Sequence, residues 1–146
     1  MTLPKPEAGL VIRYSYLWAD EHAAGHDEGR KDRPCAIILA VITEDGGADR
    51  VIVVPITHVP PLDQKAAMEI PATVKKALGL DQDRSWIVIA ESNDFVWPGP
   101  DLRRIGDATS GPFAYGHLPS RYFVEVRRRF VEIERSSRRR SVPRTE

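Results

Sequence analysis

A stretch of ten residues, PCAIILAVIT (Pro34–Thr43), limits the choice of fold more than any other part of the chain. It is apolar almost throughout and rich in β-branched side chains, which is the pattern of a strand buried on both faces. Asp-Gly and Gly-Gly pairs within residues 44–49 favour a turn, and a second β run, RVIVVPIT (Arg50–Thr57), follows it. The two runs predict a hairpin. Pro55 needs a bulge or an edge position there, because it has no N–H to donate.

The other periodic segments add strands and two helices around this hairpin. LVIRYSYLW (Leu10–Trp18) and SWIVIAES (Ser85–Ser92) have strand patterns. IPATVKKALGL (Ile70–Leu80) begins with a proline and ends near a glycine, which predicts a short helix. From Ser120, expected as its N-cap, apolar residues recur every three or four positions and predict an amphipathic C-terminal helix. The order of elements predicts a mainly β fold with peripheral helices, a small curved antiparallel sheet or barrel.

Length and charge distribution set the domain organisation. With 146 residues, of which 42% are hydrophobic, the chain predicts one domain over residues 1–135 and a flexible basic tail over 136–146. The net charge is zero, which gives no general argument for binding nucleic acid or membranes. Nine arginines and four glutamates lie from residue 121 onward. The C-terminal helix therefore either grips RNA or an acidic partner segment, or presents a solvated charged face.

The single cysteine and the lack of long apolar runs indicate the compartment. Cys35 alone excludes an intrachain disulfide framework or a cysteine-based zinc site, and it is expected to be a small core residue. The longest apolar run, Cys35–Ile42, falls far short of the ~18 residues of a membrane-spanning helix. The first ten residues have no signal-like core. We expect a cytoplasmic protein without a membrane partner.

Four segments, taken in order, resemble the PemK/MazF family of toxin endoribonucleases from bacterial toxin–antitoxin pairs. They are GLVIRYSY, KDRPCAIILAV, VPIT and IPATVKKALGLDQDRSWIVIAES, and the resemblance extends roughly from residue 9 to residue 105. It implies an SH3-like barrel and a growth-inhibiting enzyme that cleaves single-stranded mRNA without metal or cofactor. It also implies a homodimer that a cognate antitoxin neutralises.

The resemblance carries two residues into the RNA-cleaving site. In the family, the arginine of the Arg-Pro pair and the hydroxyl residue that closes the third strand lie in that site, and they correspond here to Arg33 and Thr57. Metal-free cleavage uses the neighbouring 2′-hydroxyl as nucleophile and needs a cation on the phosphorane. A planar guanidinium can grip two phosphate oxygens and stays charged when partly desolvated. Thr57 can hydrogen-bond the same phosphate.

Two further cationic residues lie just before the start of the predicted strand that begins at the Arg-Pro pair. Arg30 and Lys31 immediately precede the Arg-Pro pair and are candidate RNA contacts. The alternative is a solvated loop in which Arg33 pairs with Asp32 or Asp27.

The general base is not carried over, because ESNDFVWPGPDLR replaces the family's common Arg-Thr-hydrophobic-Asp pattern after the fourth strand. Glu91 and Asp94 flank the end of that strand, and either carboxylate can act as base if burial raises its pKa. The alternative is a surface acid paired with Arg103 or Arg104.

Two other segments contain candidate contacts. The loop over residues 19–32 is longer and more acidic than the family's short Gly-rich loop, and loops of that length are often functional. His22 and His26 in it are half of a metal site at most, so no metal is predicted, and His26 is a candidate mobile acid or base and RNA contact. Phe95 and Trp97 precede Pro-Gly-Pro and either stack on unpaired bases or pack in a turn.

A second possible function has the same fold but no RNA-cleaving activity. Such a protein is a binding toxin that blocks a target such as gyrase, as the related CcdB toxins do, or a nucleic-acid-binding module without turnover. The pairing of Arg33 with Thr57 favours the nuclease. The lack of an unambiguous base favours binding.

Overall fold

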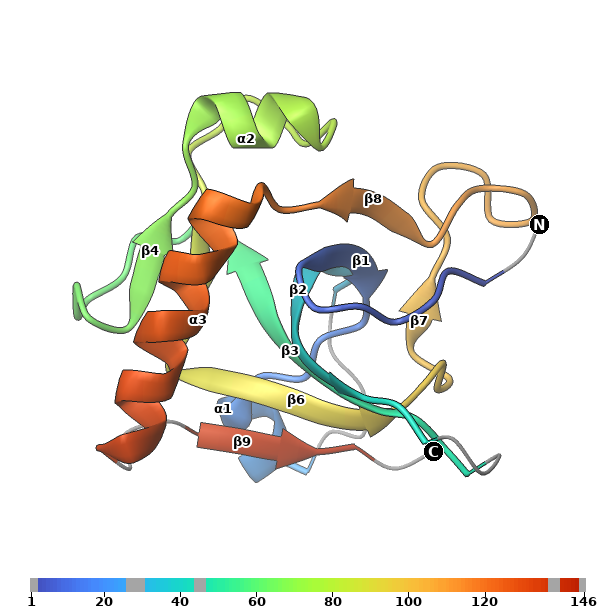
Figure 1. Cartoon of the computed structure of the whole chain (residues 1–146), viewed down its shortest axis with the longest axis horizontal. Coiled ribbons are helices and arrows are strands. Elements are labelled where there is room, and N and C mark those ends of the chain that lie inside the picture. The colour runs from blue at the N-terminus through green and yellow to red at the C-terminus, as the bar shows by residue number, and fades with distance from the viewer. Residues whose placement is uncertain (1–2, 26–30, 44–46, 137–139, 145–146) are drawn as a thin grey trace.

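The chain forms a mainly antiparallel sheet with a long helix packed across it (Figure 1). The computed structural model describes residues 3–25, 31–43, 47–136 and 140–144. In chain order its elements are β1 (Leu10–Tyr14), α1 (Ala19–Ala23), β2 (Arg33–Val41), β3 (Arg50–Thr57), β4 (Ala67–Glu69), α2 (Ala72–Ala77), β5 (Trp86–Val88), β6 (Glu91–Val96), β7 (Leu102–Arg103), β8 (Ala114–His117), α3 (Ser120–Arg135) and β9 (Arg140–Pro143).

The strands join in the order β4-β5-β3-β2-β1-β7, with β6 beside β3, β8 beside β1 and β9 beside β6. Every pairing is antiparallel except that of β6 with β9. The predicted mainly β fold with a C-terminal helix is confirmed. Among the described residues no pairing joins the outer strands β4 and β7, so the strand pairings do not by themselves make a closed barrel.

The hairpin of β2 and β3 lies at the centre of the sheet. The first part of β2 is buried on both faces as its apolar run predicts, but Leu39 and Val41 further along the strand are 47% and 52% exposed. Cys35 and Ile37 point into a core on one face with Tyr14 and Phe95, and Ala36 and Ile38 point into the core on the other face. All four β2 residues are at most 3% exposed. The second core is closed by α2 and α3, which pack apolar side chains onto the sheet.

Pro55 is accommodated by a break in the neighbouring strand. β5 pairs with the last two residues of β3, and β6 pairs with its first four. Pro55 lies between the two pairings, where the missing N–H removes a ladder donor. The amides of Ile89 and Ala90, which separate β5 from β6, donate instead to the carbonyl of Ala66, at 2.8 and 3.2 Å. The predicted single strand over Ser85–Ser92 is therefore two strands, and β3 is central.

The helices follow the predicted patterns with small shifts. In α3 the buried residues are Phe123, Val126, Phe130 and Ile133, at the predicted spacing. Pro119, and not Ser120, is its N-cap residue. The short helix α1 lies where the sequence predicted a loop. In the described ranges, no helix combines the length and the apolar character needed to cross a membrane.

The expectation of a flexible tail is wrong for residues 140–144. They form β9, which lies beside β6 in parallel (Figure 1). Val142 is 3% exposed, and the backbone N–H of Arg144 donates to the carbonyl of Asp94 at 2.9 Å. The Arg144 guanidinium is buried and donates to Asp101 at 2.7 Å and to Asn93 at 2.8 Å. The charge composition of the segment did not predict this strand, because the burial of Arg144 depends on its pairing with Asp101, a buried acid distant in sequence.

Candidate functional site

The register of the central hairpin brings Arg33 and Thr57 to the same end of the sheet. Arg33 is the first residue of β2, and Thr57 is the last residue of β3. Cys35 pairs with Pro55 in the antiparallel ladder, and each candidate lies two residues beyond that pair. Both side chains line one cavity of about 310 Å³. Its lining comes from several segments: Trp18, Lys31, Asp32, Arg33, Pro34, Ile56, Thr57, His58, Val59, Lys75, Leu80, Asp81 and Ser85.

The Arg33 guanidinium stacks on the ring of Trp18. Its guanidinium carbon lies 5.0 Å from the centre of the Trp18 ring, within cation–π range. Its Nε is buried and has no hydrogen-bond partner, and within the described part of the chain no carboxylate pairs with the guanidinium. Asp32 lies instead 3.6 Å from Arg13 and 3.7 Å from Arg103. The charge of Arg33 is therefore not neutralised by Asp32, one of the two partners that the sequence left open; the other, Asp27, lies outside the described residues.

Thr57 is nearly buried, with 9% of its surface exposed. Its Oγ1 accepts a hydrogen bond from the backbone N–H of Val59 at 3.2 Å. A hydroxyl that accepts one bond still has its proton to donate. Thr57 can therefore donate to an oxygen of a bound phosphate while its rotamer stays fixed by the turn that follows β3.

Lys75, which sequence reasoning missed, is a buried cation under the cavity. It is 4% exposed and comes from α2. Its Nζ donates to the Ser85 hydroxyl at 2.6 Å, to the Asp83 carbonyl and to the Asp81 carboxylate. A buried ammonium needs such partners, since an unpaired one costs several kcal/mol. The sequence signal was a lysine beside Val74 and three residues before Leu78, on the apolar face of the predicted helix.

His58 and Asp81 form a pair at the cavity rim. His58 Nε2 lies 2.8 Å from Asp81 Oδ2, while Asp81 Oδ1 accepts from Lys75. The hydrogen bond from Lys75, and then the one from His58, hold the pKa of Asp81 below its ordinary value. The ligand atoms of His58, Asp81 and Asp83 lie within 4.8 Å of one another. Because the Lys75 ammonium already binds Asp81, these groups are an ion-pair network in which the cation is a side chain.

The two carboxylates predicted as bases do not line this cavity. Glu91 Oε1 accepts from the Tyr16 hydroxyl at 3.2 Å and from the Ala19 N–H at 3.0 Å. Burial, and then the Glu91 charge, raise the pKa of Tyr16 well above its ordinary value. Asp94 forms an ion pair with Arg50 at 2.9 Å. Asp94 is thus paired with Arg50 and not with the predicted Arg103 or Arg104, and Glu91 is engaged by Tyr16 and Ala19.

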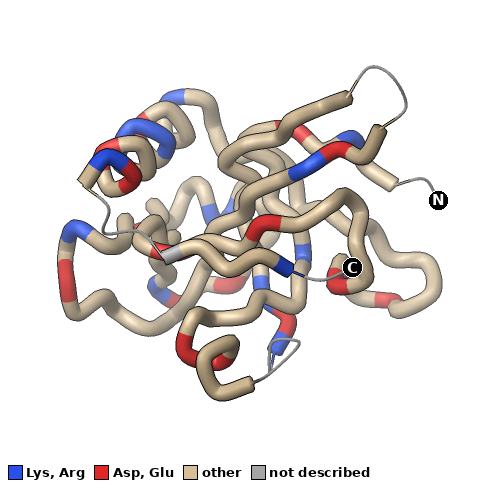
Figure 2. The backbone as a smooth tube through the Cα atoms, turned by 90° about the horizontal axis from the view of Figure 1, so that it is seen from below, with Lys and Arg blue, Asp and Glu red and all other residues tan. Residues whose placement is uncertain are grey.

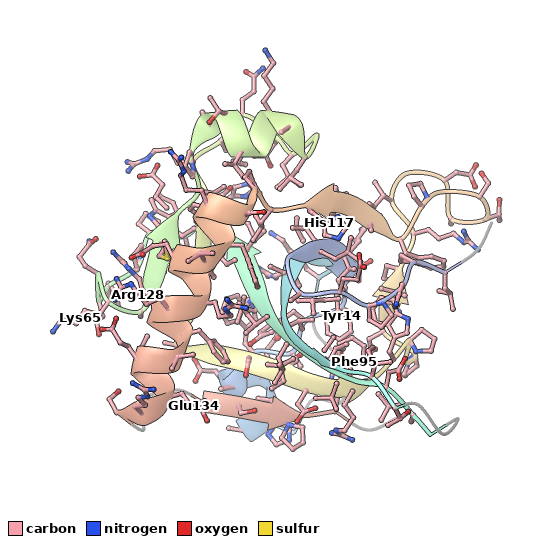
Figure 3. All side chains as sticks on the ribbon, in the orientation of Figure 1. Tyr14, Lys65, Phe95, His117, Arg128 and Glu134 are labelled. Carbon is pink, nitrogen blue, oxygen red and sulfur yellow. The ribbon has the colours of Figure 1, made fainter. Side chains whose placement is uncertain are left out.

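Phe95 is a core residue, which corrects its assignment as an RNA contact. It is 1% exposed and stacks on Tyr14 with ring centres 4.6 Å apart; Figure 3 labels the two residues next to each other. A base has no access to its face. Trp97 is half-buried beside it, with ring centres 6.3 Å apart, and packs against the same core. The packed-turn alternative describes both aromatic residues.

Lys31 is the one loop cation whose position is defined, and it is exposed at the cavity. The other loop candidates, His26 and Arg30, lie outside the described residues, as does Asp27. His22 is an exposed residue of α1.

Acids accompany the basic residues of α3. Arg128 contacts Glu125 at 2.6 Å and also contacts Glu132, and Arg129 lies 3.5 Å from Glu125. Figure 2 shows both signs of charge along this helix. The helix surface therefore has less unpaired positive charge than its arginine count indicates.

Comparison of the chain with protein-family models, with curated proteins and with solved structures found no match. The resemblance to the PemK/MazF family therefore depends on the four sequence segments.

Proposed function

We propose that this protein is a metal-independent endoribonuclease that cleaves single-stranded mRNA, in the manner of PemK/MazF toxins. One observation carries the proposal: Arg33 and Thr57, assigned to the site by resemblance, line the same cavity at the end of the central hairpin. They come from different strands, and both are fixed by rigid elements, which is what positioning a reacting phosphate requires.

The chemistry follows from the charges in the cavity. The 2′-hydroxyl oxygen attacks the adjacent phosphorus, and negative charge develops on the phosphorane oxygens. Arg33, which has no acidic partner among the residues described, offers its guanidinium to that charge. Thr57 donates a hydrogen bond to the same phosphate. Lys31, exposed at the rim, attracts the RNA backbone. The products are a 2′,3′-cyclic phosphate and a 5′-hydroxyl.

The remaining features of the proposal come from the resemblance. They are an SH3-like barrel built on the curved sheet, a homodimer, a cognate antitoxin that neutralises a growth inhibitor, and a cytoplasmic location without cofactor. Light scattering of the purified protein measures the dimer. Co-purification with the product of an adjacent small reading frame tests the antitoxin.

A second candidate is a non-catalytic binding toxin or RNA-binding module. It is favoured by the position of Glu91 and Asp94 outside the cavity, which leaves both predicted bases without access to a phosphate held by Arg33.

Incubation with a long unstructured RNA in EDTA separates the two candidates. We expect wild-type protein to make discrete cuts that end in 2′,3′-cyclic phosphate, and R33A to make none while it stays folded. R128A is the matched control, because it removes an arginine on α3 that acids already pair. Cutting by R33A at the wild-type rate refutes the role of Arg33. Binding of RNA without any cutting by the wild-type protein supports the second candidate.

A further inference from the structure

His58 follows Thr57 directly, and its side chain lines the cavity that holds Arg33. The imidazole is half-exposed, with 50% of its surface accessible, so a bound ligand can reach it. The charged groups around it are Asp32, Asp81 and Asp83 on the acidic side, and Lys75, Lys31 and Arg33 on the basic side. His58 is the one histidine among the described residues that line the cavity. Imidazole is the side chain most often used for proton transfer near neutral pH.

Asp81 fixes which ring nitrogen of His58 carries the proton. An ionised carboxylate only accepts hydrogen bonds, so the 2.8 Å contact of His58 Nε2 with Asp81 Oδ2 requires a proton on Nε2. In the neutral ring, Nδ1 is then left with a lone pair. The pKa of Asp81, lowered by Lys75 first, keeps that carboxylate ionised at neutral pH.

Lys75 fixes Asp81 in turn. Its buried Nζ has three acceptors, two of which, the Asp83 carbonyl and Ser85, lie outside the pair. The ammonium therefore stays in place and binds Oδ1 while Oδ2 faces His58. A base that is oriented by a carboxylate, which is itself oriented by another group, is a common arrangement at sites of nucleophilic attack.

From this geometry we propose that His58 is the general base of the ribonuclease, with Asp81 and Lys75 as its positioning residues. The inference rests on the proposed function and supplies the group that Glu91 and Asp94 do not.

The step balances as follows. His58 Nδ1 takes the proton of the 2′-hydroxyl while O2′ forms a bond to phosphorus. The bond between phosphorus and O5′ breaks, and the departing oxygen takes a proton from water in the open cavity. The imidazolium then returns its proton to water. Nothing is oxidised or reduced.

The first test compares cleavage of a short RNA by the wild-type protein, H58A and R33A. We expect H58A to cleave about 10²- to 10⁴-fold more slowly, which is the usual contribution of a general base. Added imidazole should restore part of the H58A activity and none of the R33A activity. H58A should bind the uncleavable 2′-deoxy analogue as tightly as the wild-type protein does.

H117A is the matched control. His117 on β8 (Figure 3) also pairs with an acid, Glu7, at 3.0 Å, and its exposure of 53% is close to that of His58. It does not line the cavity. H117A should cleave at the wild-type rate, and melting curves of both variants show whether they are folded.

The second test does not depend on cleavage. Long-range ¹H–¹⁵N spectra of the protein, with His58 assigned by comparison with H58A, should show the Nε2-protonated ring. In D81A the share of Nε2-protonated rings should fall to that of a free histidine side chain in water. A ring protonated on Nδ1 in the wild-type protein overturns the assignment of the base.

The outcomes separate the two levels of the proposal. Wild-type cleavage that is lost in R33A and unchanged in H58A overturns the role of His58 and leaves the ribonuclease intact. A folded wild-type protein that cleaves no RNA overturns both.

Discussion

Replacement of Arg144 by alanine should destabilise the protein far more than the loss of an ordinary surface charge. The Arg144 side chain is 2% exposed, and its guanidinium donates to Asp101, Asn93 and the Ser15 carbonyl, at 2.7, 2.8 and 3.1 Å. Its removal leaves the carboxylate of Asp101, whose side chain is 10% exposed, without its closest cation. Breaking a buried pair by removing one partner costs about 3–5 kcal/mol.

R84A provides the comparison, since Arg84 makes two 2.7 Å contacts with Glu69 but is 72% exposed. An exposed pair of this kind contributes little to stability, because water and salt screen it. Urea unfolding followed by tryptophan fluorescence measures both variants. We expect the unfolding midpoint of R144A to fall several times further than that of R84A.

A double variant isolates the cause. If the penalty of R144A comes from the abandoned carboxylate, then R144M/D101L should recover part of the lost stability, because apolar side chains of similar volume often replace a buried pair without loss. An R144A midpoint that matches that of R84A would refute the reasoning. It would mean that water reaches Asp101 when the arginine is removed.

Three further results are expected. F95A should lose about 3–5 kcal/mol of stability, as large core truncations do, and any loss of RNA binding should parallel the loss of folded protein in the same sample. The pKa of Asp81 is lower in the folded state than in the unfolded state, where it is about 4. The ionised carboxylate therefore stabilises the fold at pH values above the unfolded-state pKa, and this stabilisation is lost as the pH falls through the folded-state pKa. The midpoint difference between wild type and D81N should therefore be largest near neutral pH and vanish in acid; a difference that grows in acid would contradict the Lys75 contact. E91Q should cleave RNA at the wild-type rate, because Glu91 lies outside the cavity; a large loss would restore it as a base candidate.

The hairpin and the C-terminal helix could be predicted because the local pattern of hydrophobic residues determines their secondary structure. The apolar run of β2 needs burial on both faces, and α3 repeats its buried residues every three or four positions. What could not be predicted depends on partners distant in sequence. Arg144 looks like one more charge in a basic tail until Asp101 is placed beside it, and the break between β5 and β6 depends on Pro55 in another strand.

The candidate site shows the same division. Arg33 and Thr57 were found through short motifs whose register brings them together. Glu91 and Asp94 were chosen for their position after a strand, but in space they meet Ala19 and Arg50. His58 and Lys75 went unnoticed because the resemblance assigns a role to neither, although Lys75 lies within the fourth segment and His58 directly follows VPIT. Their roles become visible only in the structure, where Asp81 accepts a hydrogen bond from each of them.

The side-chain contact between Arg144 and Ser15 joins residues 129 positions apart, so it forms only after a very long loop has closed. Contacts of that span tend to appear late in folding, when most of the sheet is already assembled. Interactions absent from the transition state act mainly on the rate of unfolding. We therefore expect β9 and Arg144 to set the lifetime of the folded state and to have little effect on the speed at which it is reached.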